Sequence, residues 1–136
     1  MATRSAIALQ KGGIFQAIYC HWDGYPSHQL PILQSKYGTA STARALIAPG
    51  DLSSLETEHD WQRQPLPHPR PLYYAERGEP NVSPRSFADL AELKAWADGC
   101  CCEHVYWYQP RKGWNHEPIE HEPTPAPAPG IDPAQW

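Results

Sequence analysis

The chain has 136 residues, enough for one hydrophobic core and too few for two independent ones. Its formal net charge of -4 at pH 7 provides no positive field for a phosphate backbone, and its acidic residues form no dense runs that would mimic DNA. No apolar stretch approaches the roughly 20 residues that cross a bilayer, and the N-terminus lacks the apolar core of a signal peptide. We therefore expect a cytoplasmic protein with four reduced cysteines, no membrane contact and no direct nucleic-acid binding.

A β-hairpin is predicted at the N-terminus. Residues 4–9 carry small and apolar residues in rough alternation, Lys11-Gly12-Gly13 supplies a turn, and residues 14–20 form a second apolar run. The second run has apolar residues at both parities. It is therefore expected to be buried on both faces, near the centre of a sheet.

Two short helices and a long loop are predicted next. Leucines and a tyrosine spaced by three and four residues predict a helix from Ser27 or His28 to about Tyr37, and a second helix runs from Ser41 or Thr42 to Ile47. Residues 51–55 are interpreted as a turn. Prolines at alternate positions within residues 57–71 exclude a central strand and favour an extended, polyproline-like loop.

The remaining elements are two strands and a helix. Residues 72–75 and 104–109 are predicted strands, and Ser86 begins a helix that ends near Gly99. The element order predicts an α+β fold, a small, mostly antiparallel four-stranded sheet packed on one face by two or three helices. Residues 1–114 would form this domain, and the Pro-rich residues 115–136 a disordered tail.

The aromatic segment His21-Trp22-Asp23-Gly24-Tyr25-Pro26 breaks the strand pattern and predicts a tight turn. Such a turn can close one end of a core or anchor a partner. Trp22 and Tyr25, with Tyr19 just before the segment, and a His/Asp pair exceed what closing a small sheet requires, so we predict a partner-binding element. A second charged turn at Arg77-Gly78-Glu79 is expected to pair with Asp23. The predicted partner-binding residues are Tyr19, His21, Trp22, Asp23, Tyr25, Arg77 and Glu79.

Neither a metal site nor a catalytic residue is predicted. Cys20 and His21 are adjacent in an expected strand, where neighbouring side chains face opposite ways. Such a pair neither matches the knuckle spacing of structural zinc sites nor easily shares a proton as a nucleophile and base do. We interpret Cys20 as a small buried residue and His21 as hydrogen-bonded locally, and we expect no cofactor.

Four separated segments resemble a family of small phage and prophage proteins. They are Thr3-Arg4-Ser5-Ala6-Ile7, the run from Ile18 to Pro26, Gly50-Asp51-Leu52-Ser53-Ser54-Leu55, and Glu76-Arg77-Gly78-Glu79. The family has no agreed catalytic activity. The resemblance implies a phage or prophage accessory protein that binds and inhibits a host protein complex, as anti-defence and anti-CRISPR factors do.

Two other functions remain open. One is a small enzyme or ligand-binding module in which His21 and Asp23 line a pocket beside Trp22 and Tyr25, with Cys20 or Arg77 assisting. The other is a self-assembling structural component. The sequence determines neither the partner nor the oligomeric state.

Overall fold

The computed structural model describes residues 2–119. Most of these residues belong to a β-sheet and to helices that pack on it. The strands are β1 (Ser5–Lys11), β2 (Ile14–Trp22), β3 (Leu52–His59), β4 (Pro65–Tyr73), β5 (Arg85–Phe87), β6 (His104–Gln109) and β7 (Gly113–Pro118). The helices are α1 (Pro26–Lys36), α2 (Ala40–Ile47), the 3-10 helix η1 (Tyr74–Arg77) and α3 (Leu90–Gly99).

The seven strands form one mixed sheet. Six of them follow the order β4-β3-β2-β1-β6-β7, and the short β5 pairs with the first part of β2, whereas β3 pairs with its last part. The β1–β2 hairpin is antiparallel and β2 is central, as predicted. The prediction of four mostly antiparallel strands is wrong: there are seven, and the β2–β3 and β1–β6 pairs are parallel. The β2–β3 pair is parallel because α1 and α2 connect the two strands as a crossover, after which β3 runs in the same direction as β2.

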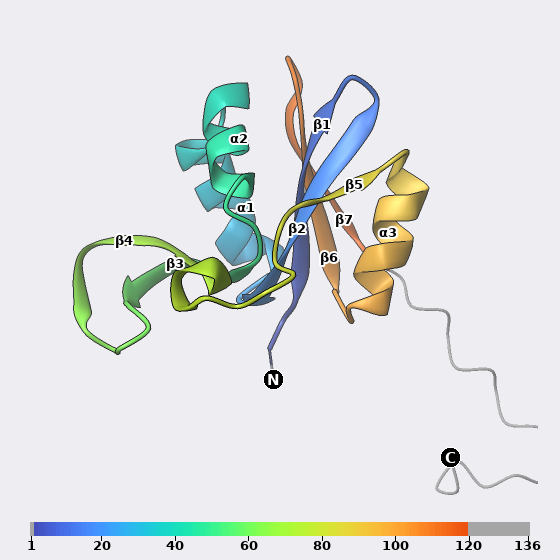
Figure 1. The fold of residues 1–136 in the computed structure, drawn as a ribbon. Coiled ribbons are helices and arrows are strands. Elements are labelled where there is room, and N and C mark those ends of the chain that lie inside the picture. The colour runs from blue at the N-terminus through green and yellow to red at the C-terminus, as the bar shows by residue number, and fades with distance from the viewer. Residues whose placement is uncertain (1, 120–136) are drawn as a thin grey trace, which may run out of the picture.

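Helices cover both faces of the sheet (Figure 1), which corrects the prediction of a single covered face. One core cluster packs α1 and α2 against residues such as Ile7, Ile18 and Tyr106. The other packs α3 against Ala8, Ala17 and neighbouring residues. Burial on two faces explains why β1, β2 and β6 carry apolar residues at both parities.

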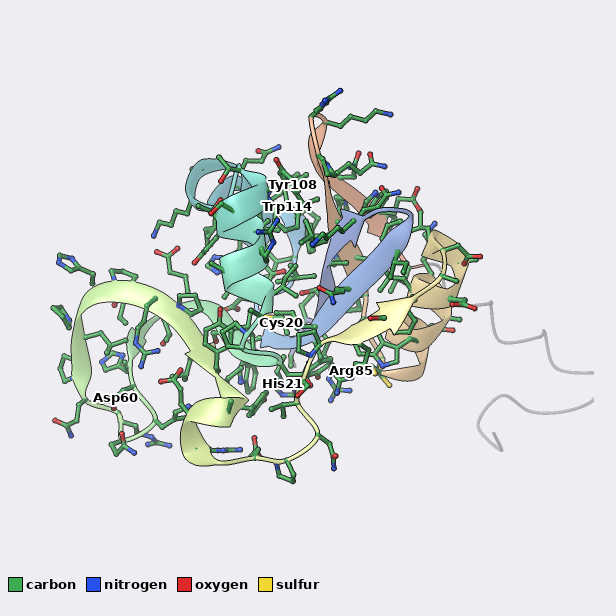
Figure 2. All side chains as sticks on the ribbon, turned by 45° about the horizontal axis from the view of Figure 1, so that its top comes forward. Cys20, His21, Asp60, Arg85, Tyr108 and Trp114 are labelled. Carbon is green, nitrogen blue, oxygen red and sulfur yellow. The ribbon has the colours of Figure 1, made fainter. Side chains whose placement is uncertain are left out.

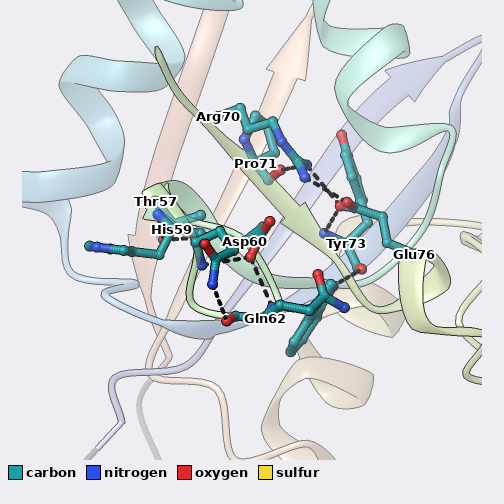
Figure 3. A network of polar contacts seen from close by, with 10 residues as sticks. Thr57, His59, Asp60, Gln62, Arg70, Pro71, Tyr73 and Glu76 are labelled. Carbon is teal, nitrogen blue, oxygen red and sulfur yellow. Dashed lines mark hydrogen bonds and ion pairs between the residues drawn. The ribbon is translucent and has the colours of Figure 1, made fainter. Parts of the chain in front are cut away.

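The β3–β4 hairpin corrects two further predictions, a turn at residues 51–55 and a loop over residues 57–71. Its strands pair with irregular register, and β4 is an edge strand of the sheet. Prolines are tolerated at an edge because alternate residues direct their backbone groups away from the neighbouring strand. Figure 3 shows how side chains support the hairpin: Asp60 accepts backbone hydrogen bonds from Gln62 and Gln64, and Arg70 forms a bidentate ion pair with Glu76.

Strand β7 extends across the predicted end of the domain at residue 114. It pairs antiparallel with β6, and Trp114 donates a 2.8 Å hydrogen bond from Nε1 to the carbonyl of Tyr37. Residues 115–118 of the predicted tail are therefore part of the sheet, and residues 120–136 lie outside the described residues. Within residues 2–119, no helix has the length and apolar character that a membrane span requires.

Candidate functional site

The aromatic turn, residues 22–25, lies at the end of the sheet where β2 finishes and α1 begins. Asp23 has a φ of 56°, and the amide of Gly24 donates a 2.8 Å hydrogen bond to the carbonyl of Thr3. A Cβ at Gly24 would lie 2.8 Å from both the Ser5 Cβ and the Thr3 carbonyl oxygen. Only glycine therefore lets the turn approach the start of β1 this closely.

Two further sets of hydrogen bonds hold the turn. The buried Tyr106 hydroxyl donates a 2.7 Å bond to the Gly24 carbonyl, and the Tyr25 carbonyl accepts bonds from the amides of His28 and Gln29 at the start of α1. The turn is thus attached to β1, β6 and α1 at once. Its backbone is fixed by local bonds to α1 and by bonds to residues 3 and 106, of which Tyr106 is 82 positions away in the chain.

A buried polar chain lies beneath the turn. The Ser5 hydroxyl donates to Gln29 Oε1 at 2.7 Å, and Gln29 Nε2 donates to Cys20 Sγ at 3.1 Å. All three residues are fully buried, and burial raises the pKa of the Cys20 thiol to about 12. Cys20 is therefore a protonated, structural thiol at neutral pH, which agrees with its interpretation as a small buried residue.

His21 faces the opposite side of the sheet from Cys20, because the two are neighbours in β2; Cys20 belongs to the cluster under α1 and α2, and Tyr19, two residues before His21, packs on the α3 side. Its Nδ1 atom lies 2.7 Å from the Tyr19 hydroxyl. Burial and the charge of Arg4 lower the pKa of His21, and burial raises the pKa of Tyr19. Both side chains are therefore neutral near pH 7.

The turn exposes its largest side chains. Trp22 is 46% exposed and Tyr25 is 41% exposed, and among the described residues only Ile14, at 50%, is a comparably exposed large hydrophobic residue. The Trp22 ring meets the His21 ring edge-on at 4.7 Å, and the Tyr25 ring lies 5.7 Å from that of His28. Asp23 is also exposed. Of the three sequence-predicted aromatic residues, Trp22 and Tyr25 thus face solvent, whereas Tyr19 is half-buried.

Arg77 and Glu79 are not joined to Asp23. Instead they pair with one another at 3.0 Å, and the Arg77 guanidinium lies 4.3 Å from the ring centre of Trp61 and 5.4 Å from that of Tyr74. The expected contact with Asp23 is wrong, because the short η1 turn directs Arg77 toward the β3–β4 hairpin. Trp61 was not predicted as a site residue, since it lies in a segment interpreted as a loop.

A buried carboxylate joins the aromatic turn to the rest of this surface. Asp51 Oδ1 accepts a 2.8 Å hydrogen bond from the backbone amide of Tyr19 and forms an ion pair with Arg85. The Arg85 guanidinium also lies over the ring of Trp96. Figure 2 places Arg85 and His21 at the same end of the sheet. The sequence offered a signal for Asp51, the segment Gly50–Leu55, but not for Arg85.

The four segments singled out in the sequence therefore meet in space. Residues 3–5 contact the aromatic turn and Gln29, and Asp51 bonds the strand that leads into the turn. The Tyr74 amide donates a 3.1 Å hydrogen bond to the Asp51 carbonyl, and the Arg77 guanidinium lies 5.4 Å from the centre of the Tyr74 ring. This convergence marks one end of the sheet as the candidate site. No protein-family model, curated protein or solved structure matches the chain. The assignment of the candidate site therefore rests on the contacts described above.

A groove of about 380 Å³ adjoins the turn. It lies between α1 and the β3–β4 hairpin and is lined by Ser27, His28, Ile32, Glu56, Thr57, Glu58 and Pro69. A second pocket, of about 560 Å³, lies between α3 and β7. Neither is lined by His21 or Asp23, so this geometry does not favour a catalytic pocket built on that pair.

Proposed function

We propose that this protein binds another protein through the surface formed by Trp22 and Tyr25. The observation that carries the proposal is the combination of exposure and rigidity at one turn. Two large aromatic rings are each more than 40% exposed, on a backbone held by buried hydrogen bonds from Tyr106 and to Thr3. An isolated domain gains nothing from leaving such rings in water, whereas an interface gains most from them.

Rigidity favours binding because it lowers the entropy lost on association. Trp and Tyr have few rotatable bonds, and a fixed backbone leaves little further freedom to lose. The edge-on contact between Trp22 and His21 further restricts the indole. Such side chains are enriched among the residues that contribute most to binding energy.

The groove beside the turn supports a binding surface larger than two rings. His28 both lines the groove and contacts the Tyr25 ring, so the two features are continuous. A partner segment that covers Tyr25 would reach the groove between α1 and β3. Glu56 in the groove is already paired with Lys36 at 3.1 Å, so Glu58 is the acidic side chain there that favours a basic residue on that segment.

The resemblance to phage and prophage proteins supplies the biological context of the proposal. In that context the chain is an accessory protein, active in the cytoplasm of the host cell, that binds a host complex and inhibits it by covering a working surface. Defence complexes such as CRISPR effectors are the proposed class of partner. The net charge of -4 supports a protein partner over nucleic acid.

Capture from host lysate tests the proposal. The tagged wild-type chain and the Ile14→Ala variant are expected to recover the same stoichiometric partner, and the Trp22→Ala/Tyr25→Ala variant to lose it while keeping the wild-type melting temperature. Ile14 is the matched control because it is equally exposed at the far end of the β1–β2 hairpin. Recovery of no partner, or equal recovery by the double variant, would overturn the proposal.

Phage growth tests the inhibitory part. Expression of the wild-type chain should restore growth of a sensitive phage in a defended host by orders of magnitude and leave growth in an undefended host unchanged. The double variant should restore nothing. Unchanged growth in defended hosts would remove anti-defence from the proposal and leave protein binding to the capture experiment.

A further inference from the structure

Arg4 is placed beside the aromatic turn on the α3 side of the sheet. The antiparallel ladder ends at the pair Ser5–Cys20, and continuing its register outward places Arg4 opposite His21. The charge of Arg4 acts on both Tyr19 and His21, which agrees with this placement. The backbone of Arg4 is fixed, because its carbonyl accepts a 2.8 Å hydrogen bond from the amide of Glu103. Arg4 is partly buried rather than extended into solvent.

The Arg4 guanidinium has no hydrogen bond or ion pair within residues 2–119. The other arginines near this surface are each neutralised: Arg85 by Asp51, Arg77 by Glu79 and Arg70 by Glu76. A partly buried, unpaired guanidinium forgoes interactions that an anion would supply. Of these four arginines, Arg4 is the one without a carboxylate partner within residues 2–119.

The neutral imidazole of His21 presents a donor rather than an acceptor to this charge. Burial keeps the Tyr19 phenol neutral, and burial together with Arg4 keeps His21 neutral near pH 7. We assign the 2.7 Å contact as a bond donated by the phenol to Nδ1, which puts the imidazole proton on Nε2. Nε2–H is then a donor on the same face as the five N–H groups of Arg4.

We propose that Arg4 and His21 form a receptor for one carboxylate, the side chain of an Asp or Glu on the protein partner. This rests on the proposed function, since the occupant is part of the protein that covers Trp22. The fork of a guanidinium matches a carboxylate with two parallel hydrogen bonds, and the imidazole N–H adds a third. Trp22, in contact with His21, favours an apolar residue beside the acidic one.

A carboxylate fits better than a phosphate. A phosphate group carries about -1.5 to -2 charges near pH 7 and is usually held by several cations. Among the arginines that the structure places near the turn, Arg77 and Arg85 are already neutralised, which leaves the single charge of Arg4. The overall charge of -4 further opposes a highly charged anion.

Titration of the labelled full-length chain with the peptide acetyl-Leu-Glu-amide, followed by NMR, tests the assignment. We expect saturable shifts at the Arg4 Nε–H and the His21 ring, and an upward shift of the His21 titration midpoint, because a bound carboxylate favours the imidazolium. Arg4→Gln should weaken binding at least tenfold. Arg4→Lys keeps the positive charge but lacks the two parallel donors of the guanidinium, so it should weaken binding by a smaller factor. Arg44→Gln, on an exposed position of α2, is the matched control and should bind like wild type.

The outcomes separate this inference from the proposed function. Absence of saturable shifts, or full binding by both Arg4 variants, would overturn the receptor, and tighter binding of inorganic phosphate than of the peptide would overturn the carboxylate assignment. Two Arg4 variants are used so that a folding defect in one leaves the other as the test. The titration needs no host protein, so its result is independent of partner capture.

Discussion

The hydroxyl of Tyr106 donates a 2.7 Å hydrogen bond to the carbonyl of Gly24, 82 positions earlier in the chain. Tyr106 belongs to β6 and is fully buried, whereas Gly24 is part of a turn whose aromatic neighbours face solvent. One buried bond thus links the middle of the sheet to its exposed end. The rigidity proposed for the aromatic turn depends on this link more than on any contact within the turn.

Tyr106→Phe should lower the free energy of unfolding by about 1–3 kcal/mol, because the buried Gly24 carbonyl loses its donor and the ring stays in place. Chemical denaturation followed by tryptophan fluorescence measures the change. Tyr25→Phe is the control: Tyr25 is 41% exposed, so the expected change is within about 0.5 kcal/mol. Equal stabilities of the wild type and the Tyr106 variant would show that the bond contributes nothing.

Gly24→Ala should destabilise the fold by about 1–3 kcal/mol, since the new Cβ would lie 2.8 Å from Ser5 and Thr3 atoms that are fixed in β1 or just before it. Gly99→Ala is the matched control. A Cβ there meets no atom within 4 Å, and Gly99 ends α3, so alanine should be neutral or stabilise by up to about 1 kcal/mol. Thermal unfolding compares the two, and a stable Gly24→Ala variant would contradict the close approach.

Stability should fall as the pH is lowered from about 7 to 5. His104 Nδ1 lies 2.9 Å from His116 Nε2. Burial and the neighbouring imidazole lower the pKa of His104, and burial lowers the pKa of His116. Because the folded pKa values lie below the unfolded value of about 6.5, the unfolded chain binds more protons in this range, and the stability present above that pH is lost as the pH falls through the folded values.

Urea unfolding at several pH values measures this dependence. His116→Gln should reduce its slope, with a remaining slope from His104 and from His21, whose pKa is also lowered by burial. A wild-type stability that rises toward pH 5 would contradict the neutral histidine pair.

The four cysteines should differ sharply in their reaction with iodoacetamide in the native protein at about pH 7.5. Cys101 is exposed and should be alkylated first, whereas Cys20 and Cys102 are fully buried, with thiol pKa values raised by that burial. Mass spectrometry of digested samples measures the order, with the urea-unfolded chain as the control in which all four react. Rapid modification of Cys20 in the folded protein would indicate an activated thiol instead.

Local patterns predicted the elements whose residues are buried on both faces. The β1–β2 hairpin was predicted from the Gly12-Gly13 turn and the two apolar runs, and β6 from Val105 to Tyr108. The edge strands were not predicted. Strand β7 carries Trp114 as its one large apolar residue, and the prolines of β4 are compatible with a strand only at an edge.

The start of α3 shows how tertiary contacts overrode a local signal. Ser86 was predicted to begin the helix, but residues 85–87 pair with β2, and Asp89 caps the helix by accepting a hydrogen bond from the amide of Glu92. The helices at 26–36 and 40–47 were placed within a few residues of the prediction. Which strands pair in parallel depends on contacts that no local pattern carries.

The candidate site was predictable only in part. The exposure of Trp22 and Tyr25 follows from an unusual density of aromatics in one turn, which the sequence shows directly. The stacking of Arg77 on Trp61 and the pairing of Asp51 with Arg85 join residues 16 and 34 positions apart. Those contacts depend on the pairing of β3 with β4 and of β5 with β2, which the sequence pattern did not predict.

Site-specific photo-crosslinking in host cells tests the central claim most directly. A photoreactive phenylalanine analogue is placed at position 22 in one variant and at position 14 in the other, both of which are exposed. The proposed function predicts one discrete crosslinked partner from position 22 and none from position 14. No crosslink at position 22, or the same products from both positions, would contradict a recognition surface at the aromatic turn.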